Sequence, residues 1–404
     1  MRITKRIEDC LILLLILVCS TQSFFAKYFS FADEVIEVIL FMYVVLFDYF
    51  LNKKKKLHIN KNTVIITAIF ILLTMLNVFI KKYNFMAYLE EILNYFKFLL
   101  ILEMFKLIEI DNQRIKKFLN FFIIITVISC LYGLYRFYIK TSYISGDMHR
   151  NGKLRIAGFS GHPITLAFSS LTCVAYLMNN LKKSSLKVKI IKIFLTGFFI
   201  YCIFLTQSRL VLFFLVMYFI YRILFKIYEK SINKKKTFYV LATLSLSVIL
   251  IIALTFSSNI KGYLKGDIED TIRFFSMKKV FEILPDNFLL GTGIGTFSCR
   301  AASKYYSYVY TKYDFSQFYE YTFLGDCFES QLAKILIQTG VLGFLFYYYF
   351  LMKNFKLAKK NELLIYLYLI LFIEMIFNPI YQIPYAIILA IVNSNNYFIK
   401  NNNK

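Results

Sequence analysis

The chain is built from apolar stretches of about 20 residues, and this repeated length limits what it can fold into. Each stretch matches the length of α-helix that crosses a bilayer core of about 30 Å. The stretches are 10–26, 35–51, 62–80, 88–108, 118–139, 163–180, 188–206, 210–226, 238–256, 331–352, 362–378 and 383–396. A soluble protein with 59% hydrophobic residues would expose large apolar patches. The sequence therefore predicts an all-α polytopic membrane protein with about 12 transmembrane helices, forming a single integral membrane domain over residues 1–404.

The stretch 88–108 is the least regular of these, because Glu90, Glu91, Lys97 and Glu103 interrupt it. A charged side chain that faces lipid costs several kcal/mol. We therefore expect these four side chains to face the protein interior or the interface.

Lysines gather in every second connection between the apolar stretches. They are Lys53–Lys56, Lys116, Lys117, Lys182, Lys183, Lys187, Lys189, Lys234–Lys236, Lys353, Lys356, Lys359 and Lys360. Cytoplasmic loops of membrane proteins carry an excess of basic residues. This alternation places both termini in the cytoplasm, and leaves 140–161 and one large extracytoplasmic loop, 257–330, outside. The net charge of +24 then reflects topology, and no nucleic-acid partner is predicted, since no basic stripe stands apart from the loops.

Arginines are distributed differently from lysines, because most of them fall outside or at the outer boundary. These are Arg136, Arg150, Arg155, Arg209, Arg273 and Arg300. A guanidinium is a planar fork that suits phosphate, whereas an ammonium is a solvated point charge. The bias predicts an anionic ligand on the outer face; the alternative is a set of interfacial arginines that snorkel.

The outer loop 257–330 contains a candidate helix and a glycine cluster. Asp270 and Thr271 can cap a helix from about Ile272 to Leu284, which would carry Arg273 near its first turn. We expect its apolar positions Ile272, Phe275, Val280, Phe281 and Leu284 to lie on the membrane surface. The cluster Gly291-x-Gly293-x-Gly295 lacks the glycine spacing and the βαβ unit of a nucleotide site. It instead predicts close approach of the backbone to another helix or to a ligand.

Two further motifs lie where the sixth and eighth apolar stretches begin. In the first, Arg155 is followed by Gly158, His162 and Pro163, and the proline suits a first helical turn. Arg155 could hold a phosphate there with the helix-start amides, or the segment is an ordinary loop with a lone interfacial histidine. In the second, Thr206-Gln207-Ser208-Arg209 places an arginine where the helix dipole favours anions. An anion beside Arg209 would explain this, and so would snorkelling or pairing with a loop carboxylate.

Glu329 closes the outer loop and is the candidate general base, since partial desolvation raises the pKa of a carboxyl group. A carboxylate that caps a helix or forms a salt bridge is the alternative. Other acidic residues compete for the role of base: Asp267, Glu269, Asp270, Asp314, Glu320 and Asp326. The seven cysteines form no C-x-x-C pair or Cys/His cluster, so no metal site is predicted. Cys299 and Cys327 both fall in the outer loop, where two ordinary thiols are favoured over a disulfide.

Together these motifs resemble the O-antigen polymerase and ligase superfamily of membrane glycosyltransferases. The resemblance is carried in order by Arg155-x-x-Gly158-x-x-x-His162-Pro163, by Thr206-Gln207-Ser208-Arg209, by Arg273 with Leu284-Pro285 and the glycine cluster, and by Glu329-Ser330 leading to Gly340-x-x-Gly343. It implies a GT-C-like enzyme of the bacterial plasma membrane that takes a glycan from undecaprenyl pyrophosphate, without cofactor or metal, and passes it with inversion to an acceptor hydroxyl.

The resemblance also implies roles for single residues. Arg155, Arg209 and Arg273 match the arginines that bind pyrophosphate, Glu329 is the base, and the remaining substrate-binding candidates are His162, Ser208 and Gly293. Ligases of the superfamily show a histidine-asparagine pair where this chain has Glu329-Ser330, which favours a Wzy-like O-antigen or capsule polymerase whose donor and acceptor are both lipid-linked. A ligase is the alternative, a flippase or transporter is the alternative of another class, and a co-polymerase that sets chain length remains open.

Overall fold

The computed structural model describes residues 2–21, 32–46, 61–108, 110–139, 149–150, 153–181, 185–230, 272–316, 330–358, 361–377 and 386–394. The long helices in these ranges are α1 (Arg2–Ser20), α3 (Ala32–Leu46), α4 (Lys61–Lys81), α5 (Phe85–Leu107), α6 (Asn112–Tyr138), α7 (Pro163–Asn179), α8 (Leu186–Thr206), α9 (Arg209–Lys230), α16 (Gln331–Ala358) and α17 (Glu362–Phe377). A further helical stretch covers 386–394. The described strands are the two-residue partners β1 (His149–Arg150) and β2 (Lys153–Leu154), which pair antiparallel.

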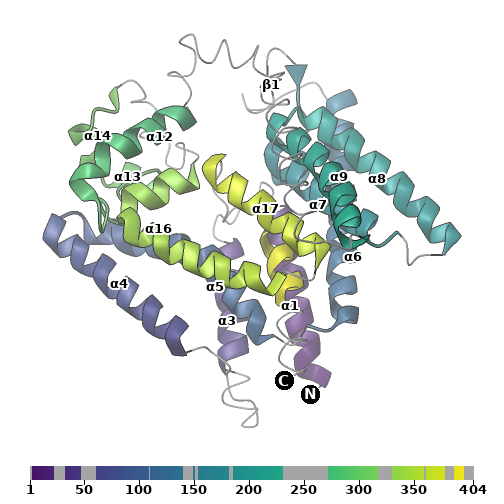
Figure 1. Ribbon diagram of the computed structural model, residues 1–404, viewed down its shortest axis with the longest axis horizontal. Coiled ribbons are helices and arrows are strands. Elements are labelled where there is room, and N and C mark those ends of the chain that lie inside the picture. Colours follow the sequence, from purple (N-terminus) through teal and green to yellow (C-terminus); the bar gives the residue numbers. More distant parts are fainter. Residues whose placement is uncertain are drawn as a thin grey trace.

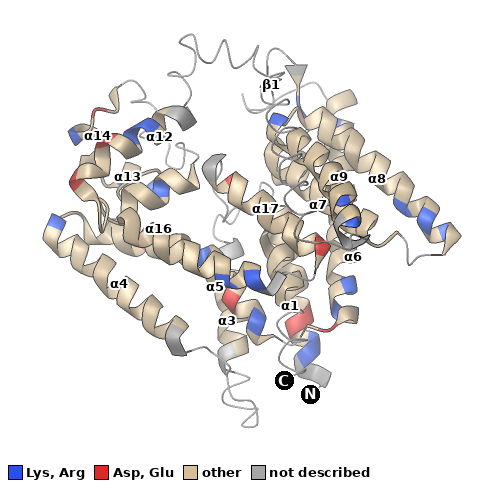
Figure 2. Ribbon diagram, in the orientation of Figure 1, with Lys and Arg blue, Asp and Glu red and all other residues tan. Residues whose placement is uncertain are grey.

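Every predicted apolar stretch that falls in the described ranges is helical, whereas 238–256 lies outside them. Five of the described helices are long and apolar enough to cross a membrane: Thr63–Lys81, Asn112–Tyr138, Leu186–Thr206, Arg209–Ile227 and Gln331–Lys356. The charged residues of α4 lie at its ends and those of α8 lie in its first two turns, so the rest of each helix is apolar (Figure 2). The all-α polytopic prediction is therefore confirmed, while the count of about 12 spans stays a prediction.

The long helices form two groups that face each other across α1 and α17 (Figure 1). One group holds α6, α7, α8 and α9, with α7 and α8 packed most closely. The other holds α4, α5 and α16 together with the short helices of the loop 272–316. One continuous apolar core runs through both groups.

The charges of α5 lie inside the protein or at its exposed end, as predicted. Glu91 and Lys334 of α16 form an ion pair of 2.6 Å in which each side chain is 4% exposed. At the exposed end, Glu90 pairs with Lys304 over 2.5 Å. A buried pair of this kind is costly to break from one side, because the other charge is left uncompensated. Through these two ion pairs, α5 holds both α16 and the loop 272–316 in position.

The loop 272–316 folds on itself and on α16. Its elements are α12 (Ile272–Ile283), the 3-10 turn η5 (Pro285–Asn287), α13 (Arg300–Lys304) and α14 (Tyr308–Lys312). They enclose a second apolar core: Phe275, Val280, Ile283, Phe297, Val309 and Phe315 with Ala333 and Ile337 of α16.

The predicted helix at about Ile272 is confirmed, but the expected position of its apolar face is wrong. Phe275 and Val280 are buried in the second core, and Leu284 packs against it, while Phe281 is 75% exposed. The helix turns its apolar face to α16 because the loop has a protein core of its own to fill.

α16 is broken at Gly340, where the backbone has φ 62° and ψ −159°. The break frees carbonyl and amide groups on α16, and the loop satisfies them with its own backbone. Four bonds result: Thr292 N to Ile337 O (2.8 Å), Gly293 N to Gln338 O (2.8 Å), Val341 N to Phe288 O (2.9 Å) and Leu342 N to Leu289 O (3.2 Å). Gly291 has φ +67°, and a Cβ there would lie 2.5 Å from the Gln338 carbonyl carbon. This confirms that the glycine cluster allows close approach to another helix.

Replacing Gly291 with alanine should lower stability by about 3 kcal/mol or more, because the new methyl group overlaps the α16 backbone. The matched control is Gly197→Ala in α8, where nothing lies within 4 Å of the added Cβ. That change should leave stability equal or slightly higher, since alanine favours helix over glycine. Thermal unfolding in detergent, followed with a thiol-reactive dye on the buried cysteines, measures both. Equal midpoints for the two variants would contradict the tight contact.

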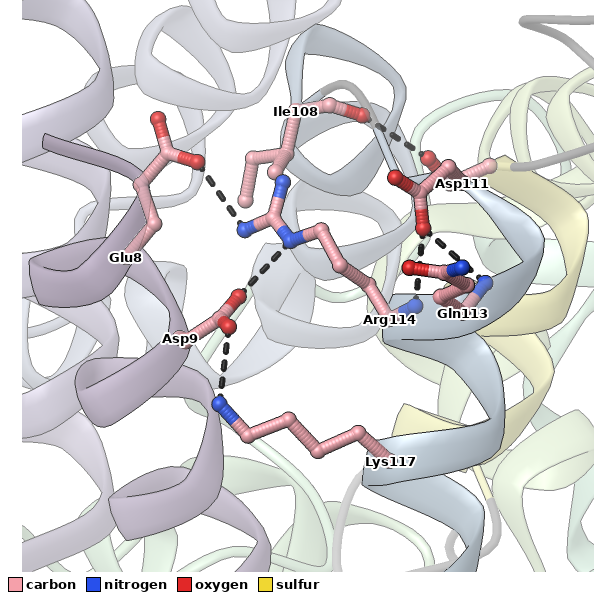
Figure 3. A network of polar contacts seen from close by, with 8 residues as sticks. Glu8, Asp9, Ile108, Asp111, Gln113, Arg114 and Lys117 are labelled. Atoms are coloured by element: carbon pink, nitrogen blue, oxygen red, sulfur yellow. Dashed lines mark hydrogen bonds and ion pairs between the residues drawn. The ribbon is translucent and has the colours of Figure 1, made fainter. Parts of the chain in front are cut away.

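At the other end of the molecule, α1 and α6 are joined by a buried arginine (Figure 3). Arg114 donates from Nε to Asp9 over 2.7 Å and from Nη2 to Glu8 over 3.0 Å. Lys117 adds a bond of 2.8 Å to Asp9. This network explains why α1 begins at Arg2, earlier than the predicted start at residue 10, since its carboxylates have cationic partners.

The end of α5 joins the same region, because Ser394 Oγ donates to the Ile108 carbonyl over 3.1 Å (Figure 3). The starts of α1 and α6 and the end of the 386–394 helix therefore lie at one end of the molecule. The prediction that both termini lie in the cytoplasm stays a prediction.

Arg114→Ala should destabilise the protein by about 3 kcal/mol, because it leaves two half-buried carboxylates without their shared partner. Lys117→Ala is the control, since its side chain is 51% exposed and its ion pair should contribute under about 1 kcal/mol. The same thermal assay compares them. If both variants unfold at the wild-type midpoint, the network does not support the helix pair.

Candidate functional site

The structure brings two of the predicted motifs together. The segment that carries Arg155 lies against the end of α8, and α8 turns there into α9. Three hydrogen bonds join them: Arg155 Nε to Thr206 O (2.8 Å), Ile156 N to Leu205 O (3.3 Å) and Gln207 Nε2 to Leu154 O (2.9 Å). We call this the Arg155–α8 junction. It places Arg155 beside the turn that leads to Arg209, the first residue of α9.

The turn between α8 and α9 is made by Gln207 and Ser208. Gln207 adopts φ 51°, a left-handed conformation that ends α8. Ser208 is buried, its amide donates to Thr206 Oγ1 over 3.3 Å, and its carbonyl accepts from Leu212 N over 3.0 Å. Ser208 therefore starts α9, and Arg209 is exposed at its first turn. Anions are stabilised at such a helix start by the backbone amides.

The Arg155 segment is held to α6 by a glycine. Gly158 has φ +59°, and a Cβ there would lie 2.3 Å from Ser129 Oγ. Ser129 Oγ also accepts from the amide of Phe159 over 2.9 Å, and the Phe159 ring stacks on Tyr132 with centroids 4.2 Å apart. The predicted turn before Pro163 is thus confirmed, and it fixes the backbone on which Arg155 stands.

A second arginine lines the same small pocket as Arg155. The pocket has a volume of about 10 Å³, and Arg136, Gly133 and Gly158 are among its lining residues. The Arg136 guanidinium carbon lies 5.9 Å from the centroid of the Tyr132 ring, within the range of a cation–π contact. Two guanidinium side chains at one pocket produce a positive potential that favours an anion.

His162 and Gly293 have structural contacts in this fold. His162 is half-buried at the start of α7, and its carbonyl accepts from Ser160 Oγ and from Leu166 N over 3.1 and 3.3 Å. Gly293 has φ +118°, and a Cβ there would lie 2.2 Å from the Tyr83 ring. Gly293 is therefore required by packing against Tyr83, and substrate binding by either residue stays a prediction.

Arg273 and Glu329 belong to the other helix group. Arg273 lies on α12, which packs on α16, and its side chain is outside the described residues. α12 and the strand β1 lie at the same end of the molecule but over different helix groups (Figure 1). The described contacts therefore join the segments of Arg155 and Arg209, whereas Arg273 stands apart from them.

Glu329 lies outside the described residues, but its neighbour Ser330 is placed. Ser330 Oγ accepts from Ala333 N over 3.2 Å and so caps α16, and it donates to the Met277 sulfur of α12 over 3.6 Å. Of the competing carboxyl groups, Asp314 is exposed and its pKa is lowered by hydrogen bonds from Ser316, which disfavours it as a base. The remaining competitors, Asp267, Glu269, Asp270, Glu320 and Asp326, fall outside the described ranges.

Within the described part of the chain, no group of three or more His, Cys, Asp or Glu residues could hold a metal ion. Cys299 is buried, and its sulfur accepts from Ala302 N over 3.4 Å. Its candidate partner Cys327 lies outside the described residues.

Residues 194–348 match the family described as O-antigen ligase. The matched stretch is somewhat less than half of the 404 residues and runs from α8 through α16, so it includes Arg209, Arg273 and the glycine cluster. Over this segment, the match supports the resemblance to the O-antigen polymerase and ligase superfamily. The comparison with curated proteins gave no match.

The match to this family supports the resemblance seen in the sequence. Its members are glycosyltransferase-like membrane enzymes that act on lipid-linked glycans, and they include both polymerases and ligases. Arg155 lies outside the matched stretch. It reaches the superfamily segment through its bond to Thr206, which is a link that the family match alone does not reveal.

Gln207→Gly should loosen the Arg155–α8 junction, because it removes the bond to the Leu154 carbonyl but tolerates the left-handed backbone. Hydrogen exchange of the segment 153–162, measured by mass spectrometry, should become about tenfold faster. Gln113→Ala, at the start of α6, is the control and should leave that segment unchanged. Unchanged exchange in the Gln207 variant would show that the side chain does not hold the junction.

Proposed function

We propose that this protein is a polysaccharide polymerase at the outer face of the bacterial plasma membrane. It transfers a glycan from undecaprenyl pyrophosphate to a hydroxyl of another lipid-linked repeat unit, for an O-antigen or a capsule. The observation that carries this proposal is the Arg155–α8 junction, which sets one arginine beside the helix start that carries another. The family match supplies the class of substrate.

The two arginines suit a departing pyrophosphate. Breaking the bond between the sugar and the lipid pyrophosphate leaves negative charge on the pyrophosphate oxygens, and fixed guanidinium groups stabilise that charge most in the transition state. Arg155 uses its Nε to donate to the Thr206 carbonyl, and this bond orients the guanidinium fork. Arg209 adds an exposed guanidinium beside the first amides of α9. This arrangement requires no metal ion to neutralise the leaving group.

The other helix group would supply the base and a third arginine. The acceptor hydroxyl attacks the anomeric carbon on the face opposite the pyrophosphate, inverts it, and gives its proton to Glu329. Ser330 contacts Met277 on α12, the helix that also carries Arg273. In this proposal the loop 257–330 contributes Glu329 and Arg273 to the site that holds the arginines of the α8–α9 turn.

The alternatives to a polymerase are a ligase and a flippase, and particular features of the chain bear on each. The family description favours a ligase, whereas Glu329-Ser330 in place of a histidine-asparagine pair favours a polymerase. A flippase could use broken helices to line a path through the membrane. The break in α16 is filled by the loop 288–293, which argues against such a path there. The proposal places both termini in the cytoplasm and leaves room for a co-polymerase that sets chain length.

Arg155→Ala and Arg209→Ala should each reduce turnover by about 100-fold, because each removes a group that stabilises the leaving pyrophosphate. The assay uses the purified protein in lipid discs with a synthetic undecaprenyl-pyrophosphate oligosaccharide, and follows longer lipid-linked chains and released undecaprenyl pyrophosphate. Arg6→Ala, an exposed arginine at the start of α1, is the control and should keep wild-type turnover. Lysine at position 155 or 209 should restore little activity, since it keeps the charge but loses the fork.

Each other outcome of this assay has a defined meaning. Transfer of the glycan to a supplied non-repeat acceptor, without chain growth, would establish the ligase. Movement of the intact lipid across the bilayer, without transfer, would reject the enzyme. Full turnover by Arg209→Ala would reject the pyrophosphate site.

A further inference from the structure

A second pocket, with a volume of about 270 Å³, lies between the α4–α5 turn and the loop 295–308. Its lining includes four tyrosines and two lysines: Tyr83, Tyr305, Tyr306, Tyr308, Lys81 and Lys82. We call it the tyrosine–lysine pocket. None of these residues belongs to a motif that the sequence suggested, and the pocket lies on the helix group opposite to Arg155 and Arg209.

The tyrosine walls are fixed by contacts behind them. Tyr308 OH donates to the Thr292 carbonyl over 3.0 Å, and Tyr305 OH donates to Glu90 over 2.7 Å. Burial raises the pKa of Tyr308 to about 12, so its phenol stays neutral at physiological pH. The walls are therefore formed before any ligand arrives, which lowers the entropy cost of binding.

The rim of the pocket holds two residues in a conformation that L-amino acids rarely adopt. Lys82 has φ 54° and Tyr306 has φ 49°, although neither is glycine. Each such residue costs about 1 kcal/mol or more, and strain of this kind gathers at ligand clamps and active sites. Tyr306 is also 79% exposed, so its ring is held out at the rim rather than packed into the core.

The charge around the pocket is positive. Lys81 donates to the neutral Asn287 side chain over 2.9 Å, and Lys82 is exposed beside it. The nearby carboxylates are paired with other lysines, Glu90 with Lys304 over 2.5 Å and Asp286 with Lys312 over 3.3 Å. The two lysines therefore give the pocket a net attraction for anions.

We propose that the tyrosine–lysine pocket binds an acidic sugar of the glycan substrate. The C–H faces of a pyranose ring pack on aromatic rings, phenol groups hydrogen-bond to sugar hydroxyls, and a lysine pairs with a carboxylate. The volume admits about one sugar ring with its substituents. The lining also includes the small residues Ala301, Ala302 and Gly295. This assignment rests on the proposed transfer of lipid-linked glycans and adds that the repeat unit carries an acid.

The test is binding of a free disaccharide, which needs neither the lipid nor turnover. Saturation-transfer NMR on the whole protein in phosphatidylcholine discs compares glucuronic acid linked to N-acetylglucosamine with the neutral disaccharide N-acetyllactosamine. The acidic disaccharide should bind more tightly than the neutral one. Lys82→Gln should weaken acidic binding by about fivefold and leave neutral binding unchanged, whereas Tyr306→Ala should weaken both by about fivefold. Lys116→Gln, an exposed lysine at the start of α6, is the control for lost charge.

Several results would overturn the proposal: no binding of the acidic disaccharide, equal binding of the neutral one, or binding that both pocket variants retain. An anionic lipid headgroup is the other ligand that this pocket could bind at a membrane surface. Discs that also contain phosphatidylglycerol test it. Loss of disaccharide binding in those discs would identify a lipid headgroup site and overturn the sugar assignment, whereas unchanged binding supports it. Arg155→Ala separates the two proposals, because it should reduce turnover by about 100-fold but keep disaccharide binding.

Discussion

The break in α16 at Gly340 is the constraint on which the rest of this fold depends. A helix in a bilayer cannot leave backbone groups without partners, because the hydrocarbon offers none. Here the loop 288–293 supplies them through four backbone bonds to residues on both sides of the break. The two glycine motifs of the sequence, around Gly291 and around Gly340, are therefore halves of one contact. The loop is part of the membrane helix bundle rather than an appendage to it.

This contact explains why the site has two halves. The buried Glu91–Lys334 pair fixes the first part of α16 to α5, and the loop docks on that rigid unit with its own apolar core. Arg155 and Arg209 stand on the other helix group, where the Arg155–α8 junction fixes them independently. A reaction that needs both halves would then draw on residues from both helix groups, and a long lipid-linked glycan can span them.

Sequence patterns predicted the features that depend on local chemistry. The length of the apolar stretches predicted the helices, and the cost of a charge in lipid predicted that Glu91 faces the protein interior. The glycine cluster predicted the close approach of the loop backbone to another helix, which is α16. Patterns failed where a distant partner decides the outcome. Phe275 is buried because α16 covers it. The tyrosine–lysine pocket depends on the left-handed backbone conformation of Lys82, and no local sequence motif predicts that conformation.

Arginines and lysines are distributed differently along this chain, and the chemistry of the guanidinium group gives a reason. Its several N–H donors can bind different partners. Arg114 spreads its donors over Glu8 and Asp9, so carboxylates neutralise it and it serves as a buried link between helices. Arg155 instead donates from Nε to a backbone carbonyl, and that bond fixes its direction. A lysine has a single side-chain nitrogen. It therefore cannot be oriented by a hydrogen bond at one atom and present its charge at another. The separate donors of an arginine therefore let the protein orient the side chain at position 155 through Nε.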